Sequence, residues 1–168
     1  MILVGCLAIS AVMFATVGCT AGGNPDSTSS PGAGSTSLPP EPDPDQPRAS
    51  FETCLELLSA DLGLGWGLVD VAMIPPIGHS PEAEDYQRMA DRLTDVLDAF
   101  RSTTSDITEA NAMPYITFMI AAMQAQVDVL TSLTKDPGSA TLKAQYDQLE
   151  ASVNSWSGSD KSVCKDVT

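Results

Sequence analysis

Basic residues, histidine and aromatic residues are all scarce in this sequence of 168 residues. Eight Lys and Arg stand against 22 Asp and Glu, which gives a formal net charge of −14. Proteins that bind DNA or RNA neutralise phosphates with clustered Lys and Arg, so we expect no nucleic-acid partner. His79 is the only imidazole, and its isolation excludes most histidine-based metal sites and catalytic triads.

The sequence also lacks the motifs that hold common cofactors. Di-iron bundles need Glu-x-x-His on facing helices, and no such motif is present. The segment Gly63–Gly67 lacks the Lys and Ser/Thr of a phosphate-binding loop. His79 stands near Glu82, Glu84 and Asp85, where a metal site is conceivable, but a solvated loop is the preferred interpretation. The other acids of this region are interspersed with Arg, as on a solvated helix face, so we expect no cofactor, no metal and no enzymatic activity.

Residues 1–18 are almost wholly apolar, and small or polar residues follow them. The run is shorter than the roughly 20 residues that a membrane-spanning helix needs. No basic residue occurs before Arg48, so a stop-transfer cluster is missing. The pattern predicts a signal peptide that is removed after export. Signal peptides normally begin with Lys or Arg, and their absence from Met1-Ile2-Leu3 favours a translation start further upstream.

The end of this run, Ala15-Thr16-Val17-Gly18-Cys19, resembles the lipobox of bacterial lipoproteins, particularly those of actinomycetes. Thr16 departs from the pattern, which usually has Leu or another aliphatic residue there. The resemblance implies that Cys19 becomes the diacylglyceryl-modified first residue, acylated by chains such as palmitate. The mature protein would then be anchored by lipid to the extracytoplasmic face of the cell membrane. Leu3-Val4-Gly5-Cys6 matches the pattern more literally, and Cys6 becomes an alternative if the chain starts upstream.

Residues 19–49 have the composition of a linker. Between Thr20 and Ala49 there are seven Pro, four Gly and five Ser, and Leu38 is the only large aliphatic residue. Such a segment buries too little apolar surface to offset the entropy lost on ordering, so we expect disorder. Its Pro-rich half, Pro39–Pro47, predicts an extended spacer. Together with the lipid anchor, the linker indicates a stalk that carries a domain.

The domain, residues 50–168, shows helical periodicity. Apolar residues recur at intervals of three, four or seven in four runs, at 51–73, 86–107, 116–133 and 142–156, with proline-containing breaks between them. Ser80-Pro81-Glu82 is typical of a helix start. We predict an all-α domain, an antiparallel up-down-up-down four-helix bundle whose apolar faces form the core. The first run consists of Phe51, Leu55, Leu58, Leu62, Val69 and Met73.

The cysteines test this topology. Once Cys6 and Cys19 are assigned to the signal and the lipid anchor, Cys54 and Cys164 remain. In an up-down-up-down bundle, the start of the first helix and the end of the fourth lie at the same end. Export provides an oxidising compartment, so we predict a Cys54–Cys164 disulfide, with two reduced thiols as the alternative.

Two functions remain open for such a domain. The first is a non-enzymatic interaction or envelope module whose partner is another envelope protein. The second is a carrier or sensor that binds an apolar molecule or a cation between its helices, and we expect Trp66, Phe118, Met119 and Met123 to line its site. Thioethers can bind Cu(I), but methionines at helical spacing more often fill a core.

Overall fold

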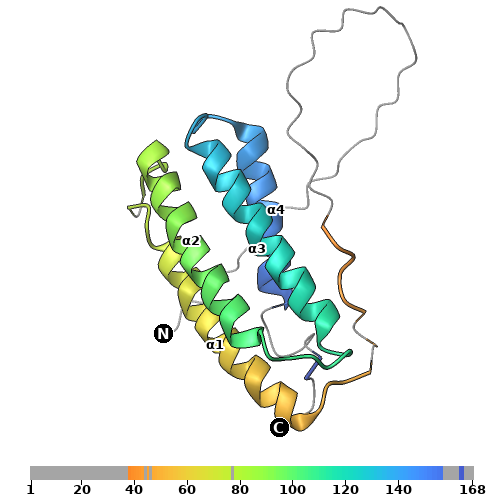
Figure 1. Ribbon diagram of the computed structural model, residues 1–168. Coiled ribbons are helices and arrows are strands. Elements are labelled where there is room, and N and C mark those ends of the chain that lie inside the picture. Colours follow the sequence, from red (N-terminus) through yellow and green to blue (C-terminus); the bar gives the residue numbers. More distant parts are fainter. Residues whose placement is uncertain (1–37, 44, 46, 77, 157–162, 165–168) are drawn as a thin grey trace, which may run out of the picture. The chain divides into compact units, whose positions relative to one another are not determined.

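A computed structural model describes residues 38–43, 45, 47–76, 78–156 and 163–164. All described residues belong to one compact unit, Thr36–Thr168. The predicted signal peptide, Cys6 and Cys19 lie outside the described residues. The described chain forms four helices, α1 (Phe51–Ala72), α2 (Ala83–Thr104), α3 (Met113–Leu133) and α4 (Ala140–Trp156) (Figure 1).

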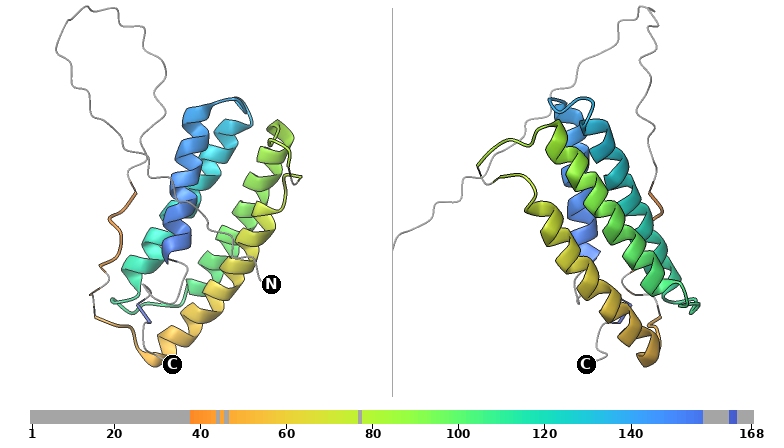
Figure 2. Two further views of the ribbon diagram at one scale, coloured as in Figure 1. Left: turned by 180° about the vertical axis from the view of Figure 1, so that it is seen from behind. Right: turned by 60° about the vertical axis from the view of Figure 1, so that its left-hand side comes forward.

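The all-α bundle predicted from the periodicity is confirmed. Consecutive helices run side by side in alternating directions, and each packs against the next (Figures 1 and 2). Among the described helices, α1–α2, α2–α3 and α3–α4 are the only pairs whose backbones lie in close contact. Helix α1 therefore has one close helical neighbour, α2. No second described helix packs closely against α1, so the bundle is open beside this helix. The sequence does not predict this opening.

Helix α3 supplies the centre of the core. Its Tyr115, Phe118, Met119 and Met123 are fully buried, and the ring of Phe118 meets Trp156 of α4 edge-on at 6.1 Å. Met119 and Met123 thus occupy core positions. This is the one helix of the described chain that is long and apolar enough to cross a membrane, and 56% of its apolar window is buried inside the domain. Its hydropathy is accounted for by its position between α2 and α4.

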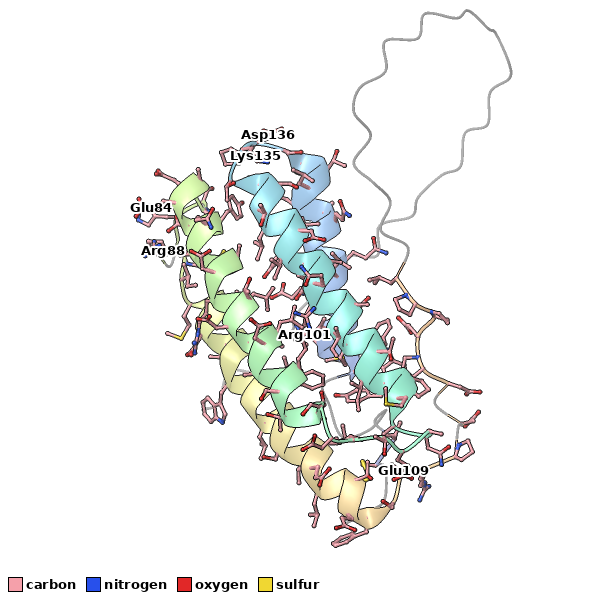
Figure 3. The ribbon with its side chains drawn as sticks, in the orientation of Figure 1. Glu84, Arg88, Arg101, Glu109, Lys135 and Asp136 are labelled. Atoms are coloured by element: carbon pink, nitrogen blue, oxygen red, sulfur yellow. A yellow bond between two sulfur atoms is a disulfide. The ribbon has the colours of Figure 1, made fainter. Side chains whose placement is uncertain are left out.

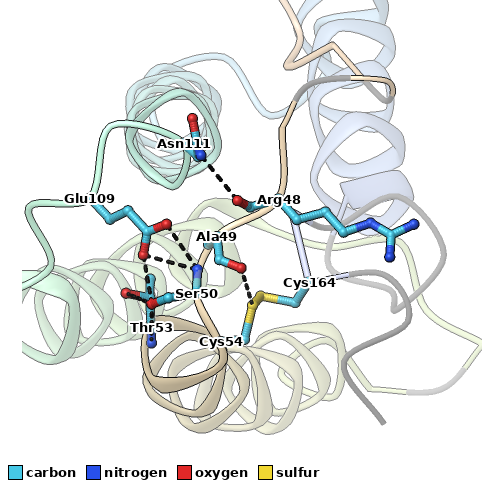
Figure 4. Close-up of a disulfide and its surroundings, with 8 residues drawn as sticks. All are labelled: Arg48, Ala49, Ser50, Thr53, Cys54, Glu109, Asn111 and Cys164. Carbon is cyan, nitrogen blue, oxygen red and sulfur yellow. Dashed lines mark hydrogen bonds between the residues drawn. A yellow bond between two sulfur atoms is a disulfide. The ribbon is translucent and has the colours of Figure 1, made fainter.

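The start of α1 is fixed by contacts from distant parts of the chain (Figure 4). Ser50 is the N-cap, and its Oγ accepts a hydrogen bond from the Thr53 N–H at 3.3 Å. The Ser50 N–H and Oγ donate to the carboxylate of Glu109, each at 2.8 Å. A hydrogen bond from the Thr53 side chain to Glu109, together with those from Ser50, lowers the pKa of Glu109. An anionic carboxylate at a helix N-terminus also interacts favourably with the positive end of the helix dipole.

A disulfide joins the first turn of α1 to the end of the chain (Figure 4). Cys54 and Cys164 are bonded, with their Cα atoms 5.5 Å apart and a sequence separation of 110. The Ala49 N–H also donates to the Val163 carbonyl at 3.2 Å. The chain after α4 therefore returns to the base of α1, and the pairing expected from the sequence is present.

The predicted linker overlaps the domain at its end. Leu38 packs against the core, and Pro42 and Ala49 are buried. The end of the predicted linker, before Ser50, therefore lies against the helical domain. The physical reason is that Leu38, the one large aliphatic residue of this segment, gains apolar contacts by lying on the domain.

Candidate interaction surface on helix α1

Helix α1 exposes a continuous row of large apolar side chains. We call this row the outer face. Its members are between 49% and 73% exposed. Single exposed apolar residues are ordinary, but contiguous patches of several hundred Å² mark interaction sites. The outer face consists of Phe51, Leu55, Leu58, Leu62, Trp66, Val69 and Met73.

The sequence predicts that most of these residues form the core side of α1, and the structure corrects this. The buried side chains lie on the opposite side of the helix. Gly67 is the point of closest approach, since a Cβ there would lie 2.5 Å from Cγ2 of Val96 on α2. Helix α1 is apolar on two faces, so periodicity alone cannot tell which one packs. The buried set is Cys54, Leu57, Ala60, Leu64, Gly67 and Val71.

The charged residues of α1 are all acidic, and they differ in their surroundings. Asp70 forms an ion pair with Arg92 of α2, at 2.6 Å between Oδ2 and Nη2. Asp61 is directed to the interior. Glu52 and Glu56 remain exposed in the N-terminal half of the helix. In the C-terminal half of α1, Asp70 is therefore neutralised by Arg92 of α2, whereas the N-terminal half carries two acids.

A groove of about 210 Å³ runs between α1 and α2 beside the outer face. Small residues such as Gly63, Gly67 and Ala99 line it, because their short side chains leave the space between the helices unfilled. Trp66 and the Asp70–Arg92 pair also border the groove. The groove thus offers an indole, a cation and an anion near one another.

Asp61 and Tyr115 form a polar contact between α1 and α3. The Tyr115 hydroxyl donates to Oδ1 of Asp61 at 2.5 Å. Burial raises the pKa of Asp61 to about 6, although the hydrogen bond from Tyr115 acts in the opposite direction. Burial and the neighbouring Asp61 raise the pKa of Tyr115. Sequence analysis missed this pair, although a lone acid between Ala60 and Leu62 in an apolar helix is a visible signal.

The structure does not bring the four predicted ligand-lining residues together. Trp66 is 73% exposed on α1, whereas Phe118, Met119 and Met123 are buried in α3. The three buried side chains pack among the other residues of the hydrophobic core. Of the four, only Trp66 borders the groove.

The charged residues singled out in the sequence lie in separate places. His79 lies exposed in the α1–α2 connection. Within the described residues, no group of three His, Cys, Asp or Glu is placed to hold a metal ion. Arg88 pairs with Asp85 at the start of α2, and Arg101 pairs with Asp98 further along the same helix (Figure 3). These acids therefore belong to local ion pairs.

Comparisons with protein-family models, with curated proteins and with solved structures give no match for this chain. No relative therefore suggests an activity, a ligand or a partner. The outer face of α1, the groove beside it and the buried Asp61–Tyr115 pair are the features from which a function can be inferred.

Proposed function

We propose that the protein is a lipid-anchored, extracytoplasmic lipoprotein whose helical domain is a non-enzymatic interaction module. The outer face of α1 carries this proposal. A row of seven large, mostly exposed apolar side chains is costly to leave in water, so a partner that covers it gains hydrophobic free energy. The lipobox-like Cys19 and the linker behind it support the anchoring, because both are typical of stalked lipoproteins.

Replacement of Cys19 tests the anchor. Cys19→Ala in the full-length chain removes the thiol that takes the diacylglyceryl group, so the protein loses its only anchor after signal removal. Two or more acyl chains give stable membrane attachment, whereas one gives marginal binding. We expect no incorporation of a clickable fatty acid and loss from the membrane fraction. Cys6→Ala is the matched control and keeps its label. Undiminished label in Cys19→Ala contradicts the assignment, and loss in Cys6→Ala moves it to Cys6.

A carrier or sensor is the second candidate, and the groove between α1 and α2 favours it. Trp66 would contact a small apolar molecule there, although the open groove of about 210 Å³ is small for a drug-sized ligand. A thermal-shift screen with lipids, haem and metal salts separates the two functions. A rise of several degrees in the melting temperature with one ligand class, abolished by Trp66→Ala, would identify the domain as a carrier and not as an interaction module. The absence of a thermal shift with every ligand class supports the interaction module.

A further inference from the structure

We propose that the outer face of α1 binds the outer face of α1 in a second copy of this chain. The two helices are antiparallel, and a two-fold axis passes beside Leu62. This inference rests on the proposed interaction module and names its partner.

The spacing of the outer face is symmetric. Its members lie at 4, 7 and 11 positions on either side of Leu62. A two-fold axis through this point places Phe51 opposite the partner's Met73 and Leu55 opposite the partner's Val69. Leu58 meets the partner's Trp66, and Leu62 meets its own copy. In a two-fold interface both subunits use the same patch, so the patch must be complementary to itself after rotation by 180°. The symmetric spacing of the outer face meets this condition.

The exposed apolar area suits a dimer. Large aromatic side chains bury about 150–250 Å² each, and the exposed fractions of the seven residues correspond to several hundred Å² in total. A standard interface needs about 800 Å² from each partner, whereas the largest patch of an ordinary monomer is about 300–600 Å². Helix α1 has 22 residues and is about 33 Å long, so two helices can pair along their whole length.

Backbone and charge also favour the antiparallel pair. A Cβ at Gly65 would meet no atom, so this part of the helix admits close approach of a large side chain from the partner. The antiparallel arrangement brings Glu52 and Glu56 toward the partner's C-terminal half, where Arg92 already pairs with Asp70. A parallel pair would instead place two acidic N-terminal halves side by side. The antiparallel arrangement avoids this repulsion between like charges, which favours it over the parallel one.

A membrane surface fits the outer face less well. Helices that lie in a membrane interface carry Lys and Arg on their polar side, which attract anionic lipids. All four charged residues of α1 are acidic. Acidic flanks repel an anionic surface, so a second copy is the favoured occupant.

Sedimentation equilibrium on residues 20–168 tests the pairing. This piece contains the complete unit Thr36–Thr168, with all four helices and the disulfide, and it lacks Cys6 and Cys19. We expect a dimer. Leu62→Glu places two carboxylates against each other at the axis and raises the dissociation constant at least about tenfold, which corresponds to about 1.4 kcal/mol. Ser102→Glu adds the same charge at an exposed site on α2 and leaves the dimer intact. Circular dichroism checks that each variant keeps its helices.

Disulfide trapping tests the register. Leu62→Cys should form a covalent dimer with itself under mild oxidation. Leu55→Cys and Val69→Cys should each crosslink weakly alone, and efficiently when the two proteins are mixed. Crosslinking of Leu55→Cys to itself above the mixed pair would replace the antiparallel arrangement by a parallel one.

Three outcomes overturn the proposal. A monomer at every accessible concentration excludes self-pairing, and a dimer that Leu62→Glu leaves intact places the interface elsewhere. Flotation of the same protein with vesicles of anionic and neutral lipids, lost in Leu62→Glu, assigns the face to the membrane. None of these results changes the labelling of Cys19 in the full-length chain, so failure of the pairing is distinguishable from failure of the lipoprotein assignment.

Discussion

At the residue scale, Asp61 is the charge that α1 directs into the domain. Its carboxyl accepts a hydrogen bond from Tyr115 on α3, whose backbone is not in close contact with α1. This hydrogen bond is therefore a direct polar link between two helices that are not close neighbours. Burial penalises the charged form of Asp61 more than the hydrogen bond from Tyr115 favours it, so the pKa of Asp61 is raised.

Stability should therefore depend on pH through Asp61. Its pKa is about 6 in the folded protein and near 3.8 when unfolded. Between these values the folded state binds more protons, so the free energy of unfolding falls as the pH rises. The stabilising contribution is complete below pH 3.8 and lost as the pH passes about 6. Two pKa units correspond to about 3 kcal/mol at most.

Asp61→Asn keeps an acceptor for the Tyr115 hydroxyl and carries no charge. We expect the variant to lose the pH dependence in this window and to be more stable than the natural protein above pH 6. Urea unfolding at several pH values measures both effects. Asp91→Asn is the control, since Asp91 is exposed and accepts from Gln87. Identical pH profiles for the natural protein and Asp61→Asn would contradict the assignment.

At the scale of the elements, α1 shows what the sequence could and could not predict. The proline-containing breaks and the apolar runs predict four helices, and all four are present. The side on which α1 packs was not predictable, because Leu57 and Leu64 on one face compete with Leu58 and Leu62 on the other. The deciding contact is tertiary: Gly67 meets Val96 of α2.

Helix starts were predicted less well than helix positions. Ser80-Pro81 suggests a start at Ser80, but Glu82 is the N-cap of α2. Its N–H donates to Oδ2 of Asp85 at 3.0 Å, and this hydrogen bond is the main reason that the pKa of Asp85 is lowered. A capping acid three residues into the helix fixes the start more firmly than the preceding Ser does.

The contact between Gly67 and Val96 predicts opposite effects for two glycines of α1. In Gly67→Ala the new Cβ would lie 2.5 Å and 2.9 Å from the two methyl groups of Val96 and 3.3 Å from its Cβ, so the Val96 side chain or the helices must shift. We expect a loss of about 1–3 kcal/mol in the free energy of unfolding. Gly63 has open space, so Gly63→Ala should gain up to about 1 kcal/mol from helix propensity.

Urea unfolding of the two variants measures this difference. A loss in both would mean that α1 is closely packed along its whole inner length. A gain in both would mean that α1 and α2 lie further apart than described.

At the scale of the whole molecule, the disulfide holds the two ends of the domain together. Helix α1 has close backbone contact with α2 alone among the described helices, and the bridge ties its first turn to the segment after α4. The sequence predicted this pairing by elimination and by the up-down topology. The backbone hydrogen bond from Ala49 to Val163, next to this bridge, had no sequence signal.

Removal of the bridge should lower stability and leave the helices intact. For a closed loop of about 110 residues, the chain-entropy estimate is roughly 4–5 kcal/mol. We expect Cys54→Ala/Cys164→Ala to melt at a lower temperature with unchanged helical circular dichroism at 20 °C, because the buried core of α2, α3 and α4 remains. A melting temperature equal to that of the natural protein would show that the bridge adds no constraint. Loss of helicity at 20 °C would show that the core depends on it.

The central claim is that the outer face of α1 is covered by a protein surface when this molecule functions. Oxidation of Met73 in the full-length chain in its own membrane measures this directly. Met73 is 73% exposed at the end of the outer face, and Met113, 39% exposed at the start of α3, is an internal reference. We expect Met73 to be oxidised several-fold more slowly, relative to Met113, in the natural protein than in Leu62→Glu. Equal rates in the two proteins would contradict it.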